Sequence, residues 1–132
     1  MRQSAPVVLL VESNEVLRAT LRHHLSRRFR VKVVEAASAN EAVAVAVQHR
    51  PRVTLLDLSL PTGTAIDTIA VIQAVEPNGY IIALIDSLDT PYVEEVVKAG
   101  AWSYLSKDLL GDQLDPLVRR ALASQHQRVL TG

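Results

Sequence analysis

The sequence has 132 residues, of which 48% are hydrophobic, and its 14 basic side chains balance 14 acidic ones. This length and apolar content predict a single domain over residues 1–132, with its core over about 6–125. Zero net charge predicts no general attraction to nucleic acid or to an anionic membrane. The absence of cysteine excludes disulfides, zinc–thiolate sites and thiol nucleophiles. Because the chain starts without a long apolar segment, we expect a cytoplasmic protein.

Short apolar runs alternate with helical patterns along the whole chain. The expected strands cover residues 7–11, 31–35, 53–57, 80–85 and 101–106. The first four expected helices end near residues 28, 49, 76 and 100, and the fifth begins somewhere in 110–116. Strict alternation of strand and helix is typical of an open parallel sheet with helices on both faces.

Several residues have the side chains that begin helices. Ser13 or Asn14 can cap the first helix, and the second opens on a capping box over residues 38–41, although its valines also fit a strand. Thr64 can cap the third helix. In the fifth, Pro116 fits a first turn, whereas an earlier start would leave this proline inside the helix.

Charged residues follow three of the expected strands. Glu12 comes after the first strand, Asp57 ends the third, and Lys107 comes after the fifth. Parallel sheets bind ligands at the carboxyl ends of their strands, close to the point where the strand order reverses. We therefore expect these three side chains to meet in one site.

Four local features of the sequence resemble the receiver domain of two-component response regulators. They are Glu12, the run Leu-Leu-Asp57 followed by Pro61, the Ala-Gly-Ala run at 99–101, and Tyr104-x-x-Lys107. The resemblance implies a flavodoxin-like α/β fold, with a five-stranded parallel sheet of order 2-1-3-4-5 and five helices. It also implies a role in phosphorelay signal transduction rather than enzymatic turnover.

The resemblance implies a role for each residue of the site. Asp57 would be the phosphoryl acceptor, and Lys107 would pair with the phosphoryl group. Glu12, Asp57 and the backbone carbonyl of Ser59 would be the protein ligands of Mg²⁺. Tyr104 stands at the aromatic switch position, which commonly rotates on activation.

Three positions depart from the family pattern. Ser13 stands where receivers usually have a second acidic residue, so Mg²⁺ binding should be weak or absent. Ile85 stands at the switch position that usually carries a hydroxyl, and it can donate no hydrogen bond. Asp86 replaces a small residue and would repel a phosphoryl group. A register shift of one residue, which would bring Ser87 to the switch position, remains an alternative.

The resemblance also implies partners. A histidine kinase or phosphotransfer protein would supply the phosphoryl group. A downstream protein or output domain, or a second copy of the chain in a homodimer, would bind the face made by the fourth helix, fifth strand and fifth helix. Trp102 and Tyr104 are the expected contact residues there, although Trp102 could instead fold over the adjacent helix. Asp108 after the lysine is also found in receivers joined to output domains, so the chain fits either a full-length protein or an excised receiver.

Three functional hypotheses follow. The first is a receiver phosphorylated on Asp57, and the second is a pseudo-receiver that acts as a protein-interaction module without phosphorylation. The third is a small flavodoxin-like enzyme or nucleotide binder that uses Glu12, Asp57 and Lys107. Against the third, no glycine-rich phosphate loop follows the first strand.

Overall fold

The structure is a computed structural model that describes residues 4–60, 65–86 and 90–131. It contains one five-stranded parallel sheet of order β2-β1-β3-β4-β5, as expected. The strands are β1 (Val7–Val11), β2 (Lys32–Ala36), β3 (Val53–Asp57), β4 (Tyr80–Ile85) and β5 (Ser103–Ser106). The described helices are α1 (Glu15–Arg28), α2 (Ala39–His49), α3 (Ala65–Val75), α4 (Thr90–Ala99), the short 3₁₀ helix η1 (Lys107–Leu109) and α5 (Leu110–Thr131).

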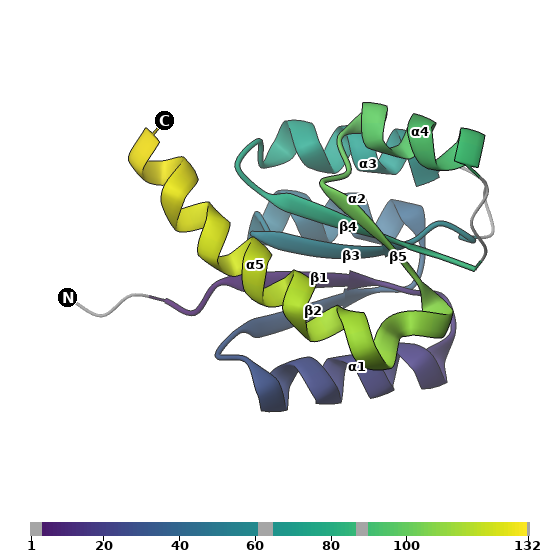
Figure 1. The fold of residues 1–132 in the computed structure, drawn as a ribbon, viewed down its shortest axis with the longest axis horizontal. Helices are drawn as coiled ribbons and strands as arrows, with labels where there is room; N and C mark the ends of the chain where they lie inside the picture. Colours follow the sequence, from purple (N-terminus) through teal and green to yellow (C-terminus); the bar gives the residue numbers. More distant parts are fainter. Residues whose placement is uncertain (1–3, 61–64, 87–89, 132) are drawn as a thin grey trace.

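Helices cover both faces of the sheet. Helices α2, α3 and α4 lie on one face, and α1 and α5 lie on the other (Figure 1). Each face has its own apolar core, because successive residues of a strand point to opposite faces. In β4, for example, Ile81 and Ile85 join the core under α2–α4, whereas Ile82 and Leu84 join the core under α1 and α5. Burial on both faces explains why β3 and β4 are almost continuously apolar in sequence.

The expected capping residues begin α1 and α2. The Asn14 side chain accepts a hydrogen bond from the Leu17 backbone N–H at 3.0 Å, which decides between the two candidate caps of α1. Ser38 Oγ accepts from the Glu41 N–H at 3.2 Å. The valine-rich segment is therefore helical, because a capped start and buried alanines outweigh the weak helix propensity of valine.

Helix α5 begins at Leu110 and continues through Pro116. Proline removes one intrahelical hydrogen bond, which would otherwise favour a later start. Three residues on one side of the helix, Leu114, Val118 and Ala121, are nonetheless buried against the sheet. Their burial holds the segment helical, because helices in proteins are stabilised more by packing than by propensity.

Some expected boundaries shift by one or two residues. Strand β5 starts at Ser103 rather than at residue 101, although the Trp102 N–H already donates to the Ile81 carbonyl at 2.8 Å. The expected cap Thr64, together with Pro61, lies outside the described residues, as does Ser87. Within the part of the chain that the structure describes, no helix has the length and apolar character needed to cross a membrane.

Candidate functional site

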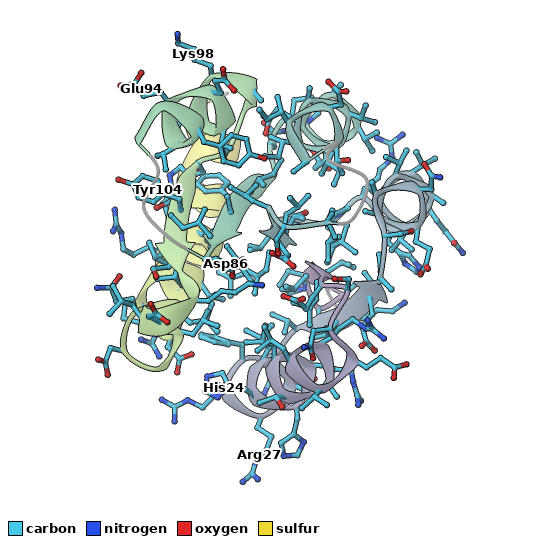
Figure 2. All side chains as sticks on the ribbon, turned by 90° about the vertical axis from the view of Figure 1, so that its right-hand side faces the viewer. His24, Arg27, Asp86, Glu94, Lys98 and Tyr104 are labelled. Carbon is cyan, nitrogen blue, oxygen red and sulfur yellow. The ribbon has the colours of Figure 1, made fainter. Side chains whose placement is uncertain are left out.

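The charged residues at the strand ends meet at one edge of the sheet, as the sequence predicts. Lys107 Nζ lies 3.0 Å from Asp57 Oδ1 and 3.3 Å from Glu12 Oε1. A third carboxylate, Asp86 Oδ1, lies 3.6 Å from the same nitrogen. Figure 2 views the molecule from this end, with Asp86 near the middle. The site therefore gathers three carboxylates around one ammonium group.

Asp57 is buried, with 1% of its surface exposed. Its Oδ1 accepts hydrogen bonds from the Ser59 backbone N–H at 3.0 Å and from the Ser59 hydroxyl at 2.8 Å. Burial alone would raise the pKa of Asp57, but the hydrogen bonds from Ser59 and the contact with Lys107 outweigh it and lower this pKa. Asp57 is therefore ionised at neutral pH.

Glu12 is also buried, and its two carboxylate oxygens differ in their surroundings. Oε2 accepts a hydrogen bond from the Asn14 N–H at 3.0 Å. Oε1 faces Lys107 but makes no hydrogen bond. Burial, opposed by the Asn14 hydrogen bond and reinforced by the charge of Asp57, raises the pKa of Glu12.

Lys107 begins η1, directly after β5, and its side chain is mostly buried. Burial alone would lower the pKa of Lys107, but the hydrogen bond and charge of Asp57, with the charges of Glu12 and Asp86, raise it. The lysine is therefore charged, and it provides one positive charge to three carboxylates.

The residues that depart from the receiver pattern differ in exposure. Ile85 is 3% exposed and belongs to the core under α2–α4. Asp86, the next residue, has a side chain that is 64% exposed and reaches the site through its contact with Lys107. Ser13 is half-buried in the turn between β1 and α1. In the register of the sheet, Ile85 pairs with Ser106, the residue before Lys107.

The two aromatic residues near β5 lie in different environments. Tyr104 is 43% exposed and points outward on the same side of the molecule as Glu94 and Lys98 of α4 (Figure 2). Trp102 is half-buried against the core, with its ring centroid 4.9 Å from that of Tyr80. The Arg120 guanidinium of α5 lies 5.6 Å from the Trp102 ring centroid. Trp102 thus packs against α5, while Tyr104 is accessible to a partner.

The donor set fits a hard divalent cation only in part. Glu12 Oε1 is a buried carboxylate oxygen without a hydrogen bond, and the Asp57 carboxylate contacts the same ammonium group of Lys107 as Glu12 does. Such anionic oxygens are the ligands that Mg²⁺ prefers. Ser13 adds no negative charge, and among the described residues no group of three His, Cys, Asp or Glu side chains is placed to hold a metal. The site therefore offers two buried carboxylates, those of Glu12 and Asp57, as candidate cation ligands.

A family model for the response regulator receiver domain matches residues 8–119. The chain belongs to this family. The sequence is 30% identical over 115 residues to YxjL, a transcriptional regulatory protein of Bacillus subtilis (strain 168), an alignment that covers 86% of this chain and 53% of that protein. The chain spans about half the length of several such relatives.

Solved structures share the fold. The CheY-like receiver domain protein of Methanospirillum hungatei JF-1 has a TM-score of 0.88 and 19% identity, with 95% of this chain and 99% of that chain covered. A response regulator of Burkholderia pseudomallei, solved with a phosphorylated aspartic acid, a calcium ion and citrate, has a TM-score of 0.78 and 24% identity, with 96% and 75% covered. These structures confirm the flavodoxin-like fold. The receiver's role in two-component signalling rests on the family match over residues 8–119 and on the similarity to YxjL.

Two groups of interactions were not predicted from the sequence. Arg18 of α1 donates a hydrogen bond to the Glu12 backbone carbonyl and pairs with Glu35 of β2. His24 of α1 contacts Asp115 of α5, with 2.6 Å between Nε2 and Oδ1. The partners of Arg18–Glu35 and His24–Asp115 lie far apart in sequence, so only the packing of the fold brings them together.

Proposed function

We propose that this receiver accepts a phosphoryl group on Asp57 from the phosphohistidine of a histidine kinase or phosphotransfer protein. The observation that carries the proposal is the Asp57 carboxylate, buried and ionised at the strand end, with Lys107 Nζ 3.0 Å away. A carboxylate oxygen would attack the phosphorus, and the phosphorus–nitrogen bond of the donor would break. The leaving imidazole nitrogen would retain the electron pair and take up a proton.

Lys107 would stabilise the product of this transfer. Its ammonium group already lies between carboxylates, so a phosphoryl group on Asp57 would place further anionic oxygens within its reach. Ser59 would hold Asp57 Oδ1 in place through its N–H and hydroxyl, so that the nucleophile needs little reorganisation.

Glu12, Asp57 and the backbone carbonyl of Ser59 would hold a bound Mg²⁺ ion, which would neutralise the transferred oxygens. The calcium ion in the phosphorylated Burkholderia relative supports divalent cation binding by this fold. Because Ser13 supplies no charge, we expect magnesium to bind this chain only at millimolar or higher concentrations. Isothermal titration calorimetry at neutral pH measures this affinity, and sub-millimolar binding would contradict the expectation.

Incubation with acetyl phosphate and Mg²⁺ followed by intact mass spectrometry tests the phosphorylation itself. We expect one added phosphoryl group in the wild type and none in Asp57→Asn, which keeps the size of the side chain but lacks the nucleophile. Peptide mapping should place the group on Asp57. An unmodified wild type under conditions that modify an ordinary receiver would contradict the proposal.

A phosphorylation-independent interaction module is the second candidate function. It is favoured by the buried, apolar Ile85 at the switch position and by Asp86, which contacts Lys107 from outside the site. In this case, binding to the partner would be the same for wild type and Asp57→Asn, with or without acetyl phosphate.

We also propose that the protein is cytoplasmic and that it binds its partner through the face made by α4, β5 and α5. A cavity of about 470 Å³ lies between β5 and α5 and is lined in part by Tyr104, Leu117 and Arg120. Its mixture of aromatic, apolar and cationic side chains supports binding of a protein partner, either an output domain or a second copy in a homodimer. Comparing the sedimentation coefficients of the wild type and Tyr104→Ala tests whether the chain forms a homodimer through this face.

A further inference from the structure

The turn between β1 and α1 carries Glu12, the acidic residue that β1 contributes to the site. One side chain ties this turn to the neighbouring strand. Arg18 Nη1 donates to the Glu12 backbone carbonyl at 2.8 Å, and Arg18 Nε lies 3.2 Å from Glu35 Oε1 at the end of β2. The Arg18 side chain is only 17% exposed, so solvent screens these contacts less than those of a surface arginine.

We infer that Arg18 is a positioning residue for the Glu12 carboxylate, an inference that rests on the proposed function of the site. The main chain of Glu12 is held on both sides, because its N–H donates to the Ala36 carbonyl at 3.0 Å and its carbonyl accepts from Arg18. The carboxylate is held by the Asn14 N–H. All of these hydrogen bonds depend on the backbone conformation of residues 12–14.

The peptide between Glu12 and Ser13 connects the arginine to the carboxylate. Its carbonyl is the group that Arg18 binds, and rotation of this peptide would shift the following turn. The Asn14 N–H would then lose its hydrogen bond to Glu12 Oε2. Loss of the guanidinium would also leave the carbonyl without this donor in a partly buried turn, which favours such a rotation.

Glu35 orients the guanidinium. A cavity of about 140 Å³, lined by Arg18, Glu35, Glu41 and neighbouring alanines, lies beside it, so close packing does not fix its position on that side. The two hydrogen bonds therefore set its orientation, as the planar, forked donor geometry of arginine allows. Lysine, with a single ammonium group on a flexible chain, cannot reproduce both contacts in the same geometry.

Arg22 provides a matched control. Arg22 Nε lies 3.3 Å from Glu35 Oε2, so it pairs with the same carboxylate from the same helix. Arg22 makes no contact with Glu12 among the described residues. Arg18→Gln and Arg22→Gln thus each remove one positive charge and one ion pair with Glu35, but only Arg18→Gln removes the donor to the Glu12 carbonyl.

The first measurement is amide hydrogen exchange of the Asn14 N–H by NMR, in the absence of metal and phosphodonor. We expect Arg18→Gln to speed this exchange by about tenfold and Arg22→Gln to change it by less than about twofold. The second measurement is the magnesium concentration that gives half-maximal phosphorylation by acetyl phosphate, which should rise several-fold in Arg18→Gln alone. Arg18→Lys should behave like Arg18→Gln and serves in its place if that variant does not fold.

Equal effects of Arg18→Gln and Arg22→Gln, or no effect of Arg18→Gln on Asn14 exchange, would overturn the inference. Exchange at residues far from the turn should be unchanged in both variants, which separates positioning from general destabilisation. If the wild type is not phosphorylated, the proposed function fails, and the exchange measurement alone decides whether Arg18 positions Glu12.

Discussion

Glu12 and Asp57 are two carboxylates at neighbouring strand ends whose pKa values shift in opposite directions. Asp57 has strong donors on Oδ1, and they lower its pKa. Glu12 has one backbone donor and an oxygen without a hydrogen bond, so burial dominates and its pKa is raised. The local hydrogen bonds thus keep the proposed nucleophile ionised, while ionised Glu12 remains electrostatically unfavourable even beside Lys107.

Replacement of Glu12 by glutamine should stabilise the protein at neutral pH. A raised pKa in the folded state means that the contribution of Glu12 is fully present below its ordinary pKa of 4.5 and is lost as the pH rises through the folded value. Ionised Glu12 therefore costs stability at pH 7, and Glu12→Gln should raise the free energy of unfolding by about 1 kcal/mol. The gain should shrink as the pH falls toward 4.

Urea denaturation at several pH values without divalent cations measures this effect. Glu94→Gln, on the exposed surface of α4, is the control and should change the unfolding free energy little at any pH. A Glu12→Gln variant less stable than wild type at pH 7 would show that the contact with Lys107 outweighs the cost of burying the charge.

Trp102 should contribute mainly to the stability of the fold rather than to partner binding. Its ring contacts Tyr80 and Arg120 and packs against the core, so Trp102→Ala should lower the free energy of unfolding by about 2 kcal/mol. Tyr104→Ala removes an exposed aromatic side chain two residues away and should cost much less. If Trp102→Ala instead weakens self-association or partner binding at unchanged stability, Trp102 is a contact residue, as its aromatic character first suggested.

At the scale of elements, the two helices on one face of the sheet are joined by polar contacts around Asp115 of α5. Its two carboxylate oxygens face His24 at 2.6 Å and Arg28 at 3.2 Å, both on α1. The Asp115 side chain is 18% exposed, whereas both partners are more exposed. A partly buried acceptor shared by two donors should contribute more than a single surface pair.

Asp115→Ala should therefore lower the free energy of unfolding by about 1 kcal/mol at neutral pH. Asp112→Ala, one turn earlier on α5 and exposed, is the matched control and should have a smaller effect. Thermal denaturation of both variants at low and high salt measures the difference. Identical melting curves for Asp115→Ala and Asp112→Ala would show that the contacts of Asp115 add nothing to the packing of α1 against α5.

The elements themselves could be predicted from the sequence, because apolar periodicity and capping residues are local signals. Asn14 and Ser38 cap the helices that their sequence context indicates. The start of α5 was predicted only to within residues 110–116, since the local signal of Pro116 conflicts with the tertiary packing of Leu114 and Val118 that fixes the start at Leu110. Convergence of Glu12, Asp57 and Lys107 was predictable because parallel strands end at one edge.

The contacts of Arg18 and Asp115 could not be predicted in this way. The Arg18–Glu35 and His24–Asp115 contacts each join side chains from different elements, and the distance between them depends on how the elements pack together. The sequence placed both Asp86 and Lys107 near the expected phosphoryl group, but it did not predict the direct contact between them at 3.6 Å. Side-chain pairing across elements requires the packed structure.

For the whole molecule, the three departures from the receiver pattern lie at the ends of β1 and β4, where they would all act on a phosphoryl group bound to Asp57. Ser13 lies in the turn after β1, Ile85 ends β4, and Asp86 follows it at the mouth of the site. Asp86 is mostly exposed, so solvent screens its repulsion. Ile85 is buried in the core, so introducing a hydroxyl at this position removes apolar packing. Ile85→Thr should therefore lower the free energy of unfolding by about 1–3 kcal/mol.

Restoring the receiver pattern should therefore require several changes together. Ser13→Asp adds a metal ligand, Ile85→Thr adds a donor to the phosphoryl oxygens, and Asp86→Ala removes a negative charge. We expect each single variant to accelerate phosphorylation of Asp57 by acetyl phosphate only slightly. The triple variant should exceed the product of the single effects by about tenfold, because groups that contact one ligand are coupled.

The rate is measured by mass spectrometry at fixed magnesium in the wild type, the three single variants and the triple variant, with Asp57→Asn as the blank. Ile85→Val, which shortens the side chain without adding a hydroxyl, separates the loss of packing from the gain of a donor. Unfolding curves ensure that each variant is folded at the assay temperature. A wild type as fast as the triple variant would show that Ser13, Ile85 and Asp86 are tolerated in a working receiver, and that two carboxylates and Lys107 suffice for the transfer.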